Sequence, residues 1–237
     1  MLPTAGLPFL QHLLARIGAA GITHVVLGTS FKAEVFEDYF GDGSKLGLEI
    51  DYVTETEPLG TGGGIRNVLP KLRGDHAMVF NGDVLGGTTW ARSSTPTGTG
   101  TRTSPCTSCG WGIRGRSAAV PTDADGRVTA FLEKTQDPPT DQINAGCYVF
   151  KREIIERIPE GRAVSVEREV FPSLLAEDAR VYGHVDSSYW RDMGTPEDFV
   201  RGSADLVRGI APSPALDGPR GESLVHPGAG VAPGALL

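Results

Sequence analysis

The residues best suited to phosphate chemistry in this chain lie in one glycine-rich stretch, Glu57-Pro-Leu-Gly-Thr-Gly-Gly-Gly-Ile-Arg66. Four of the five residues from Gly60 to Gly64 are glycines, which would let backbone N–H groups approach a ligand without a clash from Cβ atoms. From Ile65 onward the sequence predicts a helix, and a helix N-terminus has unpaired N–H donors that suit a phosphate or a base edge. The spacing fits neither the dinucleotide fingerprint nor a P-loop. A glycine-rich structural turn is therefore the alternative interpretation of the same residues.

Four more short segments follow the glycine stretch in a fixed order. They are Val79-Phe-Asn-Gly-Asp83, Phe131-Leu-Glu-Lys134, Asn144-Ala-Gly146 and Trp190-Arg-Asp-Met-Gly-Thr-Pro196. The ordered set of five resembles the sugar-phosphate nucleotidyltransferases, and most closely their guanylyltransferase branch, which acts on mannose 1-phosphate. The resemblance covers the chain from Met1 to about Leu216, with a gap in the middle.

The resemblance implies a magnesium-assisted transfer, in which a sugar phosphate oxygen attacks the α-phosphorus of a nucleoside triphosphate and pyrophosphate leaves. Asp83 and Asp192 match the two metal carboxylates of the family, and Mg²⁺ prefers one or two carboxylates together with phosphates and water. Lys134 matches the lysine that contacts the sugar phosphate, where it would neutralise the charge of the nucleophile. The implied catalytic residues are therefore Lys134, Asp83 and Asp192.

The same resemblance assigns residues to the two substrates. Those matched to the nucleotide are Glu57, Leu59, Gly60, Thr61, Gly62, Asn81 and Gly82, and those matched to the sugar are Glu133, Asn144 and Gly146. Taken singly, several have plainer interpretations: Asp83 and Asn144 suit turns, Lys134 suits a solvated strand end, and Asp192 suits the surface before a helix. Ser165-Val-Glu167 has a counterpart in the guanylyltransferase branch, and we interpret it mainly as the start of a helix.

Helices and strands are predicted to alternate along the chain, which indicates an α/β protein. Helices are expected at 8–20, 32–40, 65–72, 151–158, 166–176 and 196–208, and strands at 23–29, 48–54, 76–80, 127–133, 145–150 and 180–185. The apolar run 23–29 is typical of a strand buried on both faces. We predict a Rossmann-like, mostly parallel mixed sheet with helices on both faces, of the nucleotide-diphospho-sugar transferase type. Ligands of such sheets bind at the carboxyl ends of the strands.

Composition narrows the class of protein further. A net charge of −7 argues against a general nucleic-acid binder, and no apolar run is long enough for a membrane span. Met1-Leu-Pro-Thr4 lacks the pattern of a signal peptide, and the three cysteines do not make an even disulfide framework. We expect a cytoplasmic protein with small-molecule substrates and no nucleic-acid or membrane partner; a homo-oligomer remains open. The pair Cys106 and Cys109 is too isolated to indicate zinc.

The chain departs from the resembling family in two places. The family begins with a strand and the signature G-G-x-G-T-R-L-x-P, whereas this chain starts at a later Met-Leu-Pro; we therefore expect a truncated domain, 1–209, that is poorly folded or inactive. Residues 92–119 lack periodicity and are rich in Ser, Thr, Gly and Arg, as in a long loop. Some codon choices for this run encode a helix, a strand and a D-P-x-x-F-G turn in another frame, so we hypothesise two compensating frameshifts.

The last segment, 210–237, is rich in Pro, Gly and Ala, which favours a disordered tail over the first coils of a left-handed β-helix. The function we expect is nucleotidyl transfer from GTP to mannose 1-phosphate, impaired in this chain. Thymidylyl or uridylyl transfer to glucose 1-phosphate is the near alternative. A catalytically inactive nucleotide-sugar-binding regulator, or a product without function, are alternatives of another class.

Overall fold

The computed structural model describes residues 1–30, 32–88, 90, 118–132, 137–218, 220–225, 228 and 230, and the backbone alone of 103–108. The chain divides into two compact units. The terminal unit, named for the two chain ends it contains, comprises Met1–Gly21, Gly82–Trp90 and Ser188–Leu237. The central unit comprises Ile22–Asn81 and Ala91–Ser187. Each unit is described by itself.

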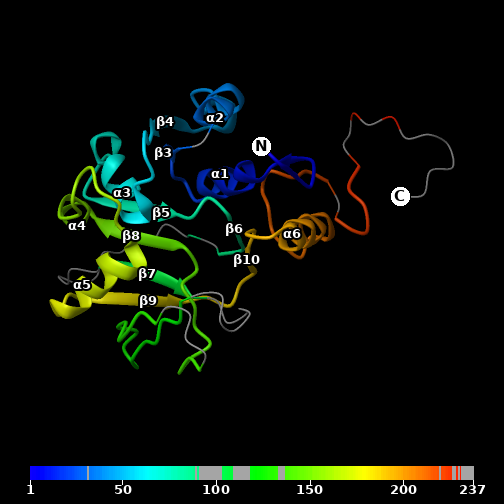
Figure 1. Ribbon diagram of the computed structural model, residues 1–237. Coiled ribbons are helices and arrows are strands. Elements are labelled where there is room, and N and C mark those ends of the chain that lie inside the picture. The colour runs from blue at the N-terminus through cyan, green and yellow to red at the C-terminus, as the bar shows by residue number, and fades with distance from the viewer. Residues whose placement is uncertain are drawn as a thin grey trace. The chain divides into compact units, whose positions relative to one another are not determined.

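The central unit contains most of the strands (Figure 1). In chain order its elements are β3 (His24–Thr29), α2 (Ala33–Phe40), the 3₁₀ turn Ser44–Leu46, β4 (Glu49–Thr54), α3 (Gly60–Asn67), the 3₁₀ turn Leu69–Lys71, β5 (His76–Phe80), β7 (Thr103–Ser108), β8 (Cys147–Lys151), α4 (Arg152–Glu156), the π-helical turn Val166–Val170, α5 (Phe171–Ala176) and β9 (Val181–Val185).

The strands of the central unit pair in both senses. β3 runs parallel to β4, with His24 opposite Glu49 and Thr29 opposite Thr54. β7 runs parallel to β9, and β5 runs antiparallel to β8. The predicted α/β class with a mixed sheet is therefore confirmed. The strand β7 also shows that residues 92–119 are not wholly irregular, although 92–102 and 109–117 lie outside the described residues.

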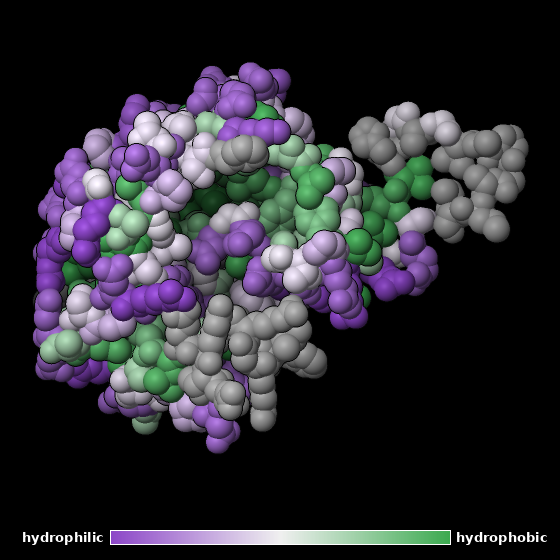
Figure 2. All heavy atoms as spheres, viewed as in Figure 1, coloured by the Kyte–Doolittle hydropathy of each residue, from purple (hydrophilic) through white to green (hydrophobic). Residues whose placement is uncertain are grey.

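Aromatic side chains form the centre of the central unit. Phe150 and Phe171 are fully buried and stack with their ring centroids 5.8 Å apart, and Tyr148 packs edge-on against Phe171 at 5.1 Å. Burying rings of this size contributes a large share of a domain's hydrophobic stabilisation. Helix α2 covers part of the surface: its Glu34, Glu37 and Asp38 are exposed, and Figure 2 shows hydrophilic residues gathered over this helix.

Two strand predictions were wrong in detail. The apolar run at 23–29 does form β3, but its residues are half-buried or exposed rather than buried on both faces. Among the described residues β3 has a ladder partner only in β4, so packing covers the strand incompletely. The predicted strand 127–133 is absent from the described part of that range, where Arg127, Val128 and Leu132 make only isolated bridges. The local β-propensity of this segment was not sufficient for a strand, because no neighbouring strand pairs with it continuously among the described residues.

The terminal unit is built on two helices. Its elements are β1 (Pro3–Thr4), β2 (Leu7–Pro8), α1 (Phe9–Ala19), β6 (Val84–Gly86), β10 (Trp190–Asp192) and α6 (Pro196–Arg208). The start of α6 follows its sequence closely, because the Thr195 hydroxyl accepts a hydrogen bond from the Asp198 N–H and Pro196 occupies the first turn. Gly209 ends the helix in a left-handed conformation with φ of 76°. The predicted helix 196–208 is confirmed to the residue.

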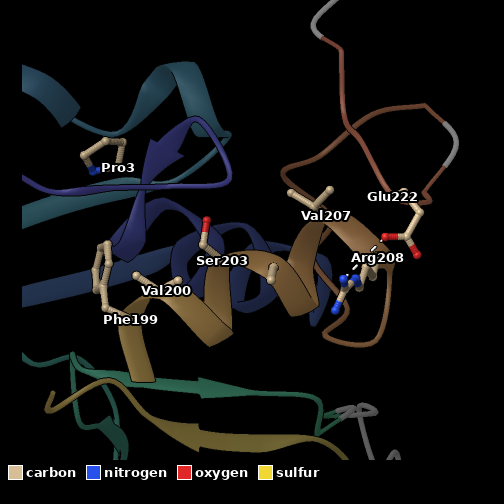
Figure 3. Close-up of a pocket in the computed structure, with 8 residues that line it drawn as sticks. Pro3, Phe199, Val200, Ser203, Val207, Arg208 and Glu222 are labelled. Atoms are coloured by element: carbon tan, nitrogen blue, oxygen red, sulfur yellow. Dashed lines mark hydrogen bonds and ion pairs between the residues drawn. The ribbon is translucent and has the colours of Figure 1, made fainter. Parts of the chain in front are cut away.

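A shallow groove runs along α6 in the terminal unit (Figure 3). Its volume is about 450 Å³, and most of its lining is apolar. The lining residues are Pro3, Phe199, Val200, Ser203, Ala204, Val207, Arg208 and Glu222. None of the residues predicted to bind substrate lines this groove. We therefore do not regard the groove as the substrate site.

The C-terminal segment contains no helix or strand among its described residues from Ile210 to Gly230. Residues 231–237 lie outside the described part, so the choice between a disordered tail and a β-helix start stays a prediction, as does the boundary at 209. None of the helices in the described residues is long and apolar enough to cross a membrane.

A buried histidine joins three segments of the terminal unit. His12 on α1 is fully buried; its Nε2 donates to the Thr4 carbonyl oxygen at 2.9 Å, and its Nδ1 lies 2.7 Å from the Ser213 hydroxyl. In the neutral ring the proton lies on Nε2, and Nδ1 accepts from the Ser213 hydroxyl. Burial lowers the pKa of His12, and the positive charge of Arg220 lowers it further.

We predict that the free energy of unfolding decreases in acid because of His12. Its folded-state pKa lies below the ordinary value of 6.5, so its stabilising effect is complete above pH 6.5 and is lost as the pH falls through the folded-state pKa. His12→Gln should lower the free energy of unfolding at pH 7.5 by about 1–3 kcal/mol and flatten its dependence on pH between 7.5 and 5. Urea unfolding at several pH values measures both effects. Replacing the exposed His76 by Gln is the control, and an unchanged pH slope in His12→Gln contradicts the assignment.

Candidate substrate-binding site

The glycine stretch packs against the backbone of Val164 within the central unit. The N–H groups of Gly62 and Gly63 both donate to the Val164 carbonyl oxygen, at 2.8 and 3.3 Å. In return, the Val164 N–H donates to the Leu59 carbonyl oxygen at 2.9 Å. Leu59 itself donates its N–H to the Glu55 carboxylate at 3.2 Å. The first turn of α3 is thus joined to a segment about 100 residues further along the chain.

The absence of side chains at these glycines is what allows this contact. A Cβ atom at Gly60 would lie 2.7 Å from the Val164 carbonyl oxygen, and one at Gly63 would lie 2.6 Å from the Arg162 carbonyl oxygen. Gly60 also has a φ of +66°, a backbone conformation that side chains disfavour. Residues other than glycine would push the two segments apart.

This packing corrects two expectations from the sequence. The helix begins at Gly60 and not at Ile65, so the glycines lie inside its first two turns. Two of the N–H groups expected to face a ligand are instead bonded to Val164. The structural interpretation of the glycines is therefore correct for Gly62 and Gly63, because the protein itself satisfies the donors of a helix N-terminus.

A hydrogen-bond network extends from this contact to the residues predicted to bind sugar. The Thr61 hydroxyl donates to Glu167 Oε2 at 3.1 Å, and the Tyr148 hydroxyl donates to Glu167 Oε1 at 3.0 Å. Asn144 Nδ2 donates to the Tyr148 hydroxyl at 2.6 Å. Asn144 Oδ1 accepts the Gly146 N–H at 3.0 Å. The structure therefore links Thr61 to Asn144 through two side chains.

Asn81 and Gly146, predicted for the nucleotide and the sugar, lie against one another at the end of β5. The Asn81 N–H donates to the Gly146 carbonyl oxygen at 2.8 Å. Gly146 has a φ of +70°, and a Cβ atom there would lie 2.7 Å from Asn81 Nδ2. Gly146 is therefore required by the protein's own backbone and by the Asn81 side chain.

The two predicted metal carboxylates lie beside one antiparallel strand pair of the terminal unit. β10 pairs antiparallel with β6, with Asp192 opposite Val84, and the Met193 N–H donates to the Asp83 carbonyl oxygen at 2.9 Å. Asp83 and Asp192 are thus one register position apart, and both residues are exposed. Gly194 leaves room for the second carboxylate, since a Cβ atom there would lie 3.2 Å from Asp192 Oδ1.

Buried polar contacts hold the strand that bears Asp192. Arg191 contacts Asp198 and Asp205 on α6, each at 3.2 Å, and donates from Nε to the Tyr189 hydroxyl at 3.0 Å. The Tyr189 hydroxyl donates to Asp205 at 2.6 Å. Burial, together with this bond to Asp205, raises the pKa of Tyr189 to about 12. The hydroxyl therefore stays protonated and keeps donating across the physiological range.

The remaining predicted residues occupy varied positions. Glu57 is exposed on the loop before α3, Leu59 is half-buried, and Gly82 is exposed before Asp83. Glu133 and Lys134 lie outside the described residues. In the central unit Thr61 is connected to Asn144 through Glu167 and Tyr148. Asn144 bonds directly to Gly146, and Gly146 to Asn81. Asp83 and Asp192 lie one register position apart in the terminal unit.

A second group of donors of the kind that can hold a metal ion lies at the start of β3 and β4. The donor atoms of His24, Glu49 and Asp51 are all within 4.8 Å of one another. Cationic groups already hold them: Lys71 contacts Asp51 at 3.1 Å, and Arg73 pairs with Glu49. Hydrogen bonds from His24 and Lys71 lower the pKa of Asp51. The glycine stretch follows the other, carboxyl end of β4, so this group serves the sheet rather than the substrate edge.

Three residues that matter in this geometry were missed or undervalued in the sequence. Val164 acts through its backbone, which leaves no signal in a sequence. Tyr148 sits in an apolar strand pattern and was counted only as part of that strand. Glu167 was interpreted as helix-start chemistry, yet it accepts from hydroxyl groups of both substrate segments. Its acidic side chain two residues after a capping serine was the one available signal.

The fold is of the nucleotide-diphospho-sugar transferase type. HddC from Yersinia pseudotuberculosis, whose crystal structure in complex with GMP-PN is known, matches the chain with a TM-score of 0.74 and 25% sequence identity. The match covers 87% of this chain and 88% of that one. The chain belongs to the nucleotidyl transferase family, which matches residues 1–209.

Similar proteins agree with this assignment. The mannose-1-phosphate guanylyltransferase of Mycobacterium tuberculosis is 68% identical over 238 residues, which cover 100% of this chain and 66% of that protein. The catalytic subunit beta of mannose-1-phosphate guanylyltransferase from Drosophila pseudoobscura pseudoobscura is 32% identical over 247 residues, 98% of this chain and 64% of that protein. The chain thus spans slightly less than two thirds of the length of these relatives.

We predict that Gly60→Ala destabilises the central unit more than Gly161→Ala does. Both glycines have left-handed backbones, with φ of +66° and +68°, so both substitutions carry a backbone cost of about 1–2 kcal/mol. Only at Gly60 would the new methyl group also clash with the Val164 carbonyl, since nothing lies within 4 Å at Gly161. Urea unfolding should give a loss at Gly60 at least about 1 kcal/mol larger. Equal losses would show that the Val164 contact does not restrain α3.

Proposed function

We propose that this chain carries the nucleotidyl-transfer domain of an enzyme that converts GTP and mannose 1-phosphate to GDP-mannose and pyrophosphate. The observation that carries the proposal is the 68% identity to a mannose-1-phosphate guanylyltransferase along the whole chain. A likeness of that extent reaches well beyond the short motifs, and it includes both groups of site residues. The GMP-PN complex of HddC supports a guanine nucleotide as the ligand type for this fold.

The reaction needs positioning and charge neutralisation more than covalent catalysis. A phosphate oxygen of mannose 1-phosphate forms a bond to the α-phosphorus of GTP. The bond from the α-phosphorus to the β-phosphate oxygen breaks, and that oxygen keeps the electron pair as pyrophosphate leaves. No proton has to move for this step, because the nucleophile is already an anion.

We propose Asp83 and Asp192 as the ligands of a Mg²⁺ ion. Two exposed carboxylates one register position apart offer the hard oxygen donors that this ion prefers, and the missing Cβ at Gly194 leaves space beside one of them. When bound, the ion would neutralise charge on the phosphates. The Arg191 contacts to Asp198 and Asp205 keep the β10 backbone, and with it Asp192, in a fixed place.

In the central unit we propose separate roles for the two linked segments. Thr61, Gly60 and Gly62 shape the first turn of α3, with Glu57, Leu59, Asn81 and Gly82 completing the nucleotide contacts. Asn144 and Gly146, with Glu133, face the sugar, and Lys134 contacts its phosphate. Glu57 is exposed and offers an acceptor for the N1 and N2 protons of guanine. We further propose a cytoplasmic protein whose partners are these two small molecules.

We predict that Asp83→Asn and Asp192→Asn each reduce Mg²⁺-dependent pyrophosphate release by on the order of 10²-fold or more, because each removes charge from the metal site. Asp217→Asn, an exposed change in the same unit, is the control. Release is measured with GTP, UTP and TTP, each with mannose 1-phosphate and with glucose 1-phosphate.

Preference for GTP and mannose 1-phosphate supports the proposal. Preference for UTP or TTP with glucose 1-phosphate contradicts it. Binding of GTP by calorimetry without any pyrophosphate release identifies a nucleotide-binding regulator instead. Full activity in both Asp variants would reject the metal assignment alone.

A further inference from the structure

We propose that Glu167 is a positioning residue that aligns the nucleotide segment and the sugar segment of the site through one carboxylate; this inference rests on the proposed function. The two oxygens of the Glu167 carboxylate contact different segments, and Oε2 also accepts from the nearby Ser165 hydroxyl at 3.2 Å. Oε2 accepts from the Thr61 hydroxyl at 3.1 Å, and Oε1 accepts from the Tyr148 hydroxyl at 3.0 Å. Tyr148 in turn contacts Asn144.

The proton arrangement on the sugar side follows from Glu167. A carboxylate can only accept, so the Tyr148 hydroxyl must use its single proton toward Glu167. The Tyr148 oxygen then accepts from Asn144 Nδ2, and this turns Asn144 Oδ1 toward the Gly146 N–H. The orientation of the Asn144 amide is therefore fixed from Glu167. Its second N–H and second lone pair stay available for sugar hydroxyl groups.

On the nucleotide side Glu167 orients Thr61. The Thr61 hydroxyl gives its proton to Glu167 and accepts the Val166 N–H at 2.9 Å. Its position on the first turn of α3 is thereby fixed from two directions. Thr61 and Asn144 are therefore both oriented from this one carboxylate, each through its own branch of hydrogen bonds.

Helix-start chemistry accounts for one Glu167 contact, the bond from the Ser165 hydroxyl at 3.2 Å, but not for those with Thr61 and Tyr148. The Ser165 hydroxyl accepts the Arg168 N–H at 3.2 Å, and Glu169 Oε1 accepts the Ser165 N–H at 3.0 Å, so Ser165 and Glu169 cap this turn. Glu167 is half-buried and points instead to hydroxyl groups. It lies on the π-helical turn Val166–Val170, a geometry that proteins often keep where a side chain serves a site.

The test compares Glu167→Gln with Glu169→Gln, the same substitution on the same turn. Glutamine has one oxygen and one NH₂ group, so at position 167 an acceptor is lost either to the Tyr148 hydroxyl or to the Thr61 and Ser165 hydroxyl groups. At position 169 the amide oxygen can still accept the Ser165 N–H. Calorimetric titrations with GTP and, separately, with mannose 1-phosphate in Mg²⁺ give the dissociation constants, and thermal unfolding of each variant is recorded.

We expect Glu167→Gln to weaken at least one of the two ligands by roughly tenfold, about the effect of one lost hydrogen bond, and Glu169→Gln to weaken neither. Tyr148→Phe cuts only the sugar branch, so it should weaken mannose 1-phosphate and leave GTP unchanged. Thr61→Val should do the reverse. This split between ligands would not follow from a general loss of stability.

Unchanged affinities in Glu167→Gln overturn the inference, as does equal weakening of both ligands in Tyr148→Phe and Thr61→Val. If Glu167→Gln does not fold, Tyr148→Phe and Thr61→Val test the inference instead, because each should weaken only one of the two ligands. If the unmodified chain binds neither GTP nor mannose 1-phosphate, the proposed function fails, and that outcome is distinct from unaltered binding in the variants.

Discussion

The carbonyl oxygen of Val164 is the contact on which the central unit's site depends. It accepts from Gly62 and Gly63, while the neighbouring Gly60 approaches it so closely that no side chain fits. Because the next residues in the chain are Ser165, Val166 and Glu167, fixing Val164 also fixes the turn that carries the carboxylate. The glycines of this stretch are therefore required first by the close approach of the Val164 backbone, whether or not a ligand is bound. The same packing shapes the first turn of α3, which we propose as part of the nucleotide site.

A second constraint governs the terminal unit. The pairing of β6 with β10 sets Asp83 and Asp192 one register position apart, and a slip of one residue in β10 would turn Asp192 to the other face. Contacts of Arg191 with α6, and of Tyr189 with Asp205, oppose such a slip. Charged and hydroxyl groups at half-buried positions are costly unless paired, so the network that anchors the strand also makes its position specific. The metal-binding chemistry that we propose depends on this register.

Much of the architecture could be predicted from the sequence where a local signal is strong. Thr195 and Pro196 before an amphipathic segment gave the bounds of α6, and the apolar pattern gave β5 at 76–80. The start of α3 was misplaced because glycine has low helix propensity, and a contact with Val164 overrides it. The burial of β3 and the strand expected at 127–133 depended on partners that no local pattern reports.

The site was predicted in the same uneven way. Residues of distinctive type, such as Asp83, Asp192 and Asn144, were proposed from their order along the chain. Their supports were not found, because Val164 acts through its backbone and Tyr148 looks like any aromatic core residue. The helix-start interpretation of Ser165-Val-Glu167 holds for the capping Ser165, but it missed the bonds from Thr61 and Tyr148 to the Glu167 carboxylate. A capping role can be distinguished from a contact with distant segments only by the distances in the folded structure.

Hydrogen–deuterium exchange of the purified chain, with and without GTP and Mg²⁺, tests the central claim most directly. If the first turn of α3 and the segment after Val164 form one nucleotide-binding element, GTP should slow exchange in residues 55–66 and 162–170 together. Slowed exchange in the first segment alone, or in neither while calorimetry shows that GTP is bound, would contradict the account.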